Sequence, residues 1–180
     1  MIVNVEEREY ARLLGYPWGK ILEGDVSERA VEAAEWYSNY GNPQVYCVTL
    51  DDTTIPFFGK GAVAAVTAGG EVDTEVKSRW DAGRVDEAYF LDRYAAGVVE
   101  KLASQLGSYR SPGTAGMPLE EQWTLFSYLA PLKPTIEILP SGMLRPKHSQ
   151  LALVSFEFPV GGNPCTRCDL AGCTFRRRAS

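Results

Sequence analysis

The sequence predicts a single α+β domain in which helices flank an antiparallel β-sheet. Its 180 residues suit one globular domain. With 45% hydrophobic and 23% charged residues, the chain can bury a core without a disulfide or metal to hold it together. Helical and strand patterns do not alternate regularly along the chain, which disfavours a doubly wound parallel sheet. We assign residues 1–160 to the domain and residues 161–180, which are rich in Cys and Arg, to a C-terminal tail.

The helices are predicted from apolar residues at helical spacing and from the residues that begin and end each helix. Asp25 and Ser27 are candidate N-caps of the second helix. The longest helix carries an apolar stripe from Val85 to Leu106. Pro118 suits the start of the last helix, with acidic residues in its first turn. The predicted helices are residues 5–14, 28–40, 71–80, 84–106 and 118–129.

The strands are predicted from β-branched and aromatic runs between turn residues. Residues 44–50, with the sequence QVYCVTL, form the first such run. The run 60–68 is mostly apolar and ends at Gly69, which is typical of a buried strand. Two further β-like segments follow in the last third of the chain, at residues 135–139 and 151–158.

Charge and hydropathy exclude several classes of protein. Lys and Arg number 18 against 23 Asp and Glu, a net charge of −5, so we expect no nucleic-acid partner and no binding to an anionic membrane. No apolar run reaches the length of a membrane span. The first ten residues are acidic and lack the apolar core of a signal peptide. We therefore expect a cytoplasmic protein in a reducing compartment.

The cysteines are the most informative residue count. Cys165, Cys168 and Cys173 form a C-x2-C-x4-C pattern whose thiolates suit an iron–sulfur cluster or zinc. Such sites usually need a fourth ligand, which Cys47 or an exogenous group could supply. Redox-active thiols and a terminal turn without function are the alternatives. His148 is the single histidine, which excludes a two-histidine metal site within one chain.

The loop at residues 107–117 is a candidate binding segment. Gly113 and Gly116 permit close approach of the backbone to a ligand. The helix that follows offers free N–H groups, and Arg110 could pair with a carboxylate or phosphate. The alternative is a plain connection between two helices.

Two further side chains are candidates by position. Glu100 lies off the apolar stripe of its helix, which by itself indicates a solvated glutamate. His148 precedes an apolar strand, where a surface or rim histidine is the default interpretation. The alternative for His148 is a ligand or proton donor near the loop.

Several short patterns occur in one order along most of the chain. Together they resemble the activation domain of cobalamin-dependent methionine synthase, and more closely its free-standing short relatives with a C-terminal Cys-rich tail. The patterns are Leu14-Gly15-Tyr16, TAGGEVD at residues 67–73, Glu100 in a long helix, Ser111-Pro112-Gly113, PLEEQ at residues 118–122, then Ser141, Met143, Pro146 and Ser149, and finally the cysteine tail followed by arginines.

This resemblance implies an α+β fold with an antiparallel sheet. It also implies that the chain is a corrinoid-protein reactivation factor or accessory subunit. In the family, the domain binds S-adenosylmethionine and uses it to remethylate cob(II)alamin while a reductase supplies an electron. The chain lacks the D-x-H-x-x-G pattern, so the resemblance implies cobalamin only on a partner, a corrinoid-carrying methionine synthase or methyltransferase module, together with an electron donor. The resemblance also implies that the chain is a methyltransferase or reactivation component of methionine biosynthesis. The implied cofactor-binding residues are Glu100, Arg110, Ser111, Pro112, Gly113 and Thr114.

Two other functions stay open. Tyr109 and Thr114 stand where the family pattern has Arg and Tyr, which motivates an iron–sulfur or metal-binding redox protein that no longer uses S-adenosylmethionine. The third is an interaction subunit that docks through the basic residues 176–178.

Overall fold

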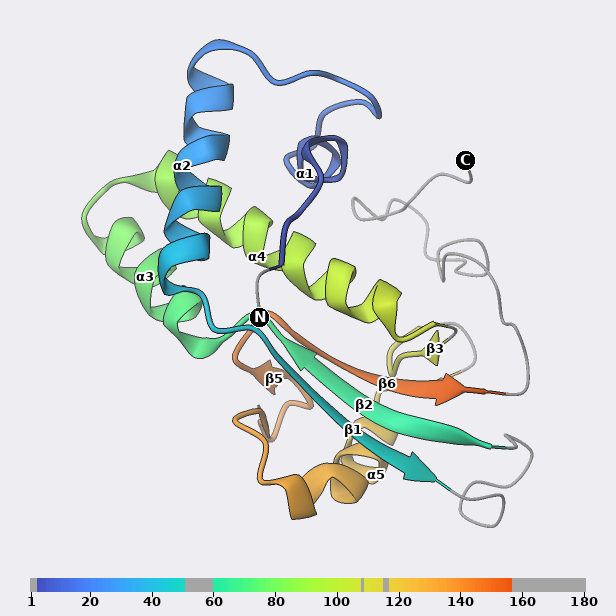
Figure 1. Cartoon of the computed structure of the whole chain (residues 1–180). Helices are drawn as coiled ribbons and strands as arrows, with labels where there is room; N and C mark the ends of the chain where they lie inside the picture. The colour runs from blue at the N-terminus through green and yellow to red at the C-terminus, as the bar shows by residue number, and fades with distance from the viewer. Residues whose placement is uncertain (1–2, 51–59, 108, 115–116, 157–180) are drawn as a thin grey trace.

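The computed structural model describes residues 3–50, 60–107, 109–114 and 117–156, and within them it has an α+β architecture (Figure 1). A four-stranded antiparallel sheet has helices packed on both faces, so the predicted fold class is confirmed. The predicted tail, with Cys165, Cys168 and Cys173, lies outside the described residues. Within the described residues, no helix combines the length and the apolar character needed to cross a membrane.

The sheet has the strand order β1-β2-β6-β3, and every neighbouring pair is antiparallel. Strand β2 is buried at all seven positions, which explains its nearly continuous apolar sequence. Its neighbour β6 is buried over the last five of its positions. The strands are β1 (Gln44–Leu50), β2 (Gly61–Thr67), β3 (Tyr109–Arg110) and β6 (Ser149–Ser155).

Helix α4 (Val85–Gln105) packs on one face of the sheet. Three further helices pack against α4: α1 (Glu7–Leu13), α2 (Gly24–Tyr40) and α3 (Gly70–Asp81) (Figure 1). The apolar stripe predicted for α4 is buried, including Leu91, Val98 and Leu102. A Cβ on Gly97 would lie 2.8 Å from Val5 Cγ1, so this glycine lets the N-terminal segment approach the helix.

The other face of the sheet carries α5 (Glu121–Leu129) and the short helix η1 (Ala130–Leu132) (Figure 1). Leu125 and Leu129 of α5 pack with residues of β2 and β6 in a second apolar core. A two-stranded sheet of β4 (Glu137–Ile138) and β5 (Leu144–Arg145) follows in sequence.

The predicted elements are present, with differences at their ends. Helix α2 begins four residues before its predicted start, without a side-chain cap from Asp25 or Ser27. Helix α5 begins at Glu121, so placing Pro118 at its first position was wrong; Pro118 O instead accepts the backbone N–H of Glu121. Strand β3 lies inside the segment predicted as a loop, and β5 was not predicted.

Candidate functional site

A cleft of about 430 Å³ lies where α4, the segment after β3 and the start of β6 meet. Its walls bring together residues that are up to 55 positions apart in the sequence. Its lining residues are Ala96, Val99, Glu100, Ser111, Pro112, Thr114, Gln122, Leu144, Lys147, His148, Ser149, Gln150 and Leu151.

Four of the six predicted cofactor residues line this cleft: Glu100, Ser111, Pro112 and Thr114. Gly113 lies between them in the same turn. Arg110 is exposed on β3 and is not among the lining residues. The structure therefore groups the loop with Glu100, and leaves Arg110 outside the group.

Ser111 fastens the loop to the sheet. Its hydroxyl donates to the carbonyl oxygen of Leu151 at 2.6 Å and accepts from Gln150 Nε2 at 2.6 Å. Ser111 is 6% exposed, so these bonds are sheltered from water. The hydroxyl is therefore committed to holding the wall of the cleft in position.

The turn after Ser111 is closed by local hydrogen bonds. Thr114 Oγ1 donates to the Ser111 carbonyl oxygen at 2.5 Å, and the Gly113 N–H donates to Met117 O at 2.9 Å. Gly113 has φ +81°, the left-handed region that side chains disfavour. The glycine is thus required by the turn itself.

Glu100 is a partly buried, paired carboxylate. Its side chain is 24% exposed, and its Oε2 accepts a hydrogen bond from Arg12 Nη2 at 2.5 Å. Arg12 is 7% exposed and its Nε also donates to Glu9 Oε2 at 3.1 Å. The interpretation of Glu100 as a solvated residue was wrong, because the fold brings α1 across this end of α4. Two carboxylates therefore share one guanidinium here.

His148 is buried, so its interpretation as a surface histidine was also wrong. Its side chain is 7% exposed and lies between two carboxylates. Nδ1 is 3.5 Å from Asp73 Oδ1, and Nε2 is 3.3 Å from Asp92 Oδ1. Burial disfavours the charged imidazolium, but the contacts with Asp73 and Asp92 outweigh it and raise the pKa of His148.

The two carboxylates are held in their ionised form. Burial opposes ionisation of Asp92, yet contacts with His148 and Lys147 outweigh it and hold its pKa far below the ordinary range. The pKa of Asp73 is also lowered, because the effects of His148 and the Lys147 backbone N–H exceed that of burial. These groups form a charged cluster along one wall of the cleft, where Lys147 and His148 are lining residues.

Sequence reasoning missed Arg12, Gln122, Lys147 and Gln150. Arg12 and Glu100 are 88 positions apart, so no local pattern could pair them. The PLEEQ pattern contained Gln122, whose Nε2 donates to the carbonyl oxygen of Gly142 and so joins α5 to the turn before β5. Lys147 and Gln150 are close to His148 in sequence, and this proximity was the available signal.

Cys47, the predicted fourth metal ligand, is an exposed residue of β1. Partial desolvation raises the pKa of its thiol, which disfavours the thiolate. Within residues 3–50, 60–107, 109–114 and 117–156, no group of three or more His, Cys, Asp and Glu side chains could hold a metal ion. The cysteine-tail metal site stays a prediction.

Comparison with known proteins finds a relative at the level of fold. Neither protein-family models nor curated proteins match the sequence. Among solved structures, the chain is similar to one described as the MetH reactivation domain bound to AdoHcy, with a TM-score of 0.66. The match covers 88% of this chain and 75% of that chain, at 13% identity. This likeness establishes a shared fold, as the sequence motifs led us to expect.

Proposed function

We propose that the cleft binds S-adenosylmethionine and that the chain is a corrinoid-protein reactivation factor or accessory subunit. The observation that carries the proposal is the gathering of Glu100, Ser111, Pro112 and Thr114 around one cleft. The cleft belongs to a fold similar to that of a domain described with AdoHcy, which is the demethylated form of S-adenosylmethionine.

Size and charge of the cleft fit this ligand. A volume of about 430 Å³ is within the range of small-molecule sites. S-adenosylmethionine carries a sulfonium and an ammonium, and the carboxylate of Glu100 in the wall of the cleft favours positive charge there. Lys147 Nζ donates to Asp92 Oδ1 at 2.5 Å, and its ammonium has further N–H donors that can pair with the ligand's carboxylate.

The chain's residues would bind and orient, while the ligand supplies the reactive methyl group. The Ser111–Leu151 and Ser111–Gln150 hydrogen bonds fix the loop against β6. A rigid wall of this kind positions a methyl donor toward an acceptor at the open side of the cleft. The acceptor would be a reduced corrinoid on a partner protein, with one electron from a separate donor.

The test is calorimetric titration with S-adenosylmethionine and AdoHcy. We expect saturable binding of both, weakened at least about fivefold in Glu100→Gln, which keeps an oxygen to accept from Arg12 while removing the charge. The matched control is Glu28→Gln on α2, an exposed glutamate that does not line the cleft. No heat and no thermal shift at millimolar ligand would contradict the proposal. Equal affinity of Glu100→Gln and the parent chain would remove Glu100 from it.

The iron–sulfur or metal-binding redox protein stays the second candidate. It is favoured by Arg110 lying outside the cleft and by the packing of Tyr109 against the core, where the family pattern has arginine. Anaerobic iron and sulfide analysis tests it. Stoichiometric metal that is lost on changing Cys165, Cys168 and Cys173 to serine together would support it, and metal-free protein after anaerobic reconstitution would contradict it.

A further inference from the structure

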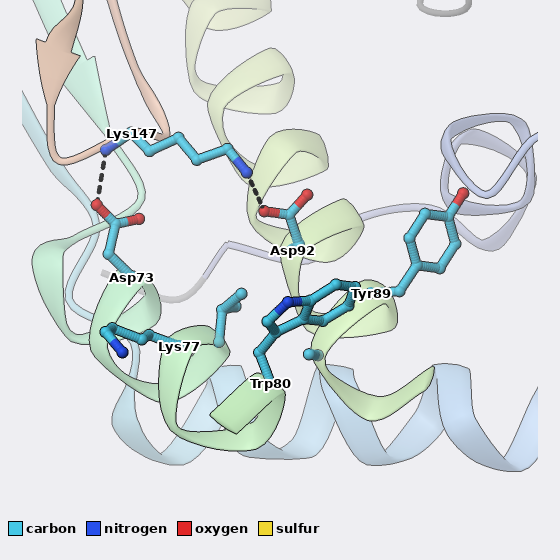
Figure 2. A pocket seen from close by; sticks show the side chains of 8 residues that line it. Asp73, Lys77, Trp80, Tyr89, Asp92 and Lys147 are labelled. Atoms are coloured by element: carbon cyan, nitrogen blue, oxygen red, sulfur yellow. Dashed lines mark hydrogen bonds and ion pairs between the residues drawn. The ribbon is translucent and has the colours of Figure 1, made fainter. Parts of the chain in front are cut away.

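A second cavity, of about 540 Å³, lies in the groove between α3 and α4 (Figure 2). It shares only Lys147 with the lining of the first cleft. Its α3 residues are spaced at i, i+3, i+4 and i+7, so they form one face of that helix. The lining residues are Asp73, Val76, Lys77 and Trp80 of α3, Ala88, Tyr89 and Asp92 of α4, and Lys147.

The lower part of this groove is apolar and aromatic. The Trp80 indole lies across the space between the two helices (Figure 2) and is 56% exposed. Ala88 of α4 also lines the groove, is fully buried, and has only a methyl side chain. Tyr89, 42% exposed, also lines the groove, and its ring extends from there toward α1, where its hydroxyl donates to Leu14 O at 3.3 Å (Figure 2). An exposed aromatic surface in a concave site is typical of ligand pockets.

The upper end of the groove is charged, and its two carboxylates differ. Asp92 is fully engaged: it accepts from Lys147 Nζ and from Arg93 Nη2, both at 2.5 Å, and lies near His148. Asp73 Oδ2 accepts the Lys147 backbone N–H at 2.7 Å (Figure 2).

Asp73 Oδ2 is the carboxylate oxygen that a ligand in the groove can reach. The other oxygen, Oδ1, is buried and faces the imidazole of His148, whose Nδ1 is 3.5 Å away. The Asp73 side chain is 30% exposed, and Oδ2 accepts the hydrogen bond from the Lys147 backbone N–H. A carboxylate oxygen has a second lone pair, so Oδ2 can accept a further hydrogen bond from a ligand. The lowered pKa of Asp73 keeps the carboxyl ionised at neutral pH.

We propose that this groove binds a small molecule in which an aromatic ring is joined by a short chain to a protonated amine. The ring would lie against Trp80 above Val76 and Ala88, and the ammonium would donate to Asp73. Asp73 and Val76 are about one helical turn apart, roughly 5 Å along the axis, so a two-carbon linker spans the distance.

The exposed Trp80 ring also favours a positive charge nearby. A cation close to an indole ring is attracted by the ring's negative face. The Tyr89 ring is already engaged by the Arg93 guanidinium, 5.5 Å from its centroid, so Trp80 is the ring that the groove offers to a ligand. The proposal is independent of the function assigned to the first cleft, because the residues that would contact the ligand, Asp73, Val76 and Trp80, do not line that cleft.

The experiment compares three probes of similar shape by calorimetry and by chemical-shift changes at neutral pH. The probes are 2-phenylethylamine, the neutral 2-phenylethanol and the anionic 3-phenylpropionate. We expect the amine to bind at least about tenfold more tightly than the alcohol, because only the amine carries a charge for Asp73. Equal or tighter binding of the alcohol or the propionate would overturn the proposal. The absence of any response to the amine at 10 mM, roughly the weakest Kd expected of such a site, would overturn it as well.

Variants locate the binding. Trp80→Ala removes the exposed ring and should weaken the amine at least about fivefold, while Trp80→Phe keeps a ring and should restore most of the affinity. Asp73→Asn keeps an oxygen for the Lys147 N–H and should abolish the preference for amine over alcohol. The control is Trp123→Ala on α5, a tryptophan of similar exposure outside the groove, which should bind like the parent chain. An unchanged Kd in Trp80→Ala, or loss of affinity in Trp123→Ala, would place the site elsewhere.

Discussion

Arg12 on α1 and Glu100 on α4 form an ion pair with a 2.5 Å hydrogen bond between Nη2 and Oε2. The guanidinium is nearly buried, and the glutamate lines the cleft. The Tyr10 hydroxyl of α1 also donates to the carbonyl oxygen of Phe90 in α4 at 2.7 Å. The ion pair orients the Glu100 carboxylate, which lines the cleft of the proposed ligand. The N-terminal helix is thereby part of the site's construction.

Removing that guanidinium should destabilise the fold. In Arg12→Ala, Glu9 and Glu100 lose their shared partner and repel each other, so the free energy of unfolding should fall by about 2 kcal/mol, less than for a fully buried pair because the carboxylates are partly exposed. Urea denaturation measures this. Arg145→Ala, which breaks an exposed pair with Glu137, is the control and should cost under about 0.5 kcal/mol. Equal effects of the two changes would mean that the Arg12 pair is no stronger than a surface pair.

The turn at Gly113 should not tolerate a side chain. Gly113→Ala meets no close atom, since the nearest is Leu119 Cδ1 at 3.7 Å, so its effect comes from φ +81° alone. We expect a loss of about 1 kcal/mol in stability and weaker binding in the cleft. Gly70→Ala, at the start of α3 and without a positive φ, should be neutral or stabilising. Thermal unfolding of both variants measures these effects. An unchanged unfolding temperature in Gly113→Ala would contradict the turn geometry.

Stability should depend on pH above about 6.5 through His148. Its pKa is raised in the folded chain, so its contribution is complete below the ordinary value of 6.5 and is lost as the pH rises through the folded value. His148 is the only histidine of the chain, so His148→Gln should remove this dependence between pH 6.5 and 9. Urea midpoints measured across that range test it. The same slope in the variant would assign the effect to another group.

Asp73 and Asp92 should make stability depend on pH in the acid range. The pKa values of Asp73 and Asp92 are lowered in the folded chain, so their contribution is present above the ordinary value of 3.8 and is lost as the pH falls below it. We expect Asp92→Asn to be less stable at pH 7 and to lose less stability than the parent chain between pH 4 and pH 2. Urea denaturation monitored by circular dichroism measures the stability of both proteins at each pH. An equal loss of stability between pH 4 and pH 2 in the variant and the parent chain would contradict the role of Asp92.

The fold was predictable where local pattern and burial agree. Strand β2 is an apolar run because helices cover both faces of the sheet, and α4 has a stripe because only one side meets the core. Strands β3 and β5, with two residues each, carry no pattern of their own and exist through pairing with β6 and β4. Their positions depend on the assembled sheet.

The candidate site was predictable in its loop and, through the family resemblance, at Glu100. The Ser111-Pro112-Gly113 motif pointed to the turn that Gly113 requires. The burial of His148 and the pairing of Glu100 depend on Asp73, Asp92 and Arg12, which come from distant parts of the chain. Long-range charge pairing leaves no periodicity in a sequence, so these two interpretations failed for the same reason.

The most direct measurement is a titration of the isotope-labelled protein with AdoHcy, followed through backbone amide chemical shifts. The account predicts saturable shifts at Glu100, Ser111, Gly113 and Gln150, with Trp80 and its neighbours on α3 unaffected. An absence of shifts at millimolar AdoHcy, or shifts confined to the groove between α3 and α4, would contradict the claim that the first cleft binds the methyl donor.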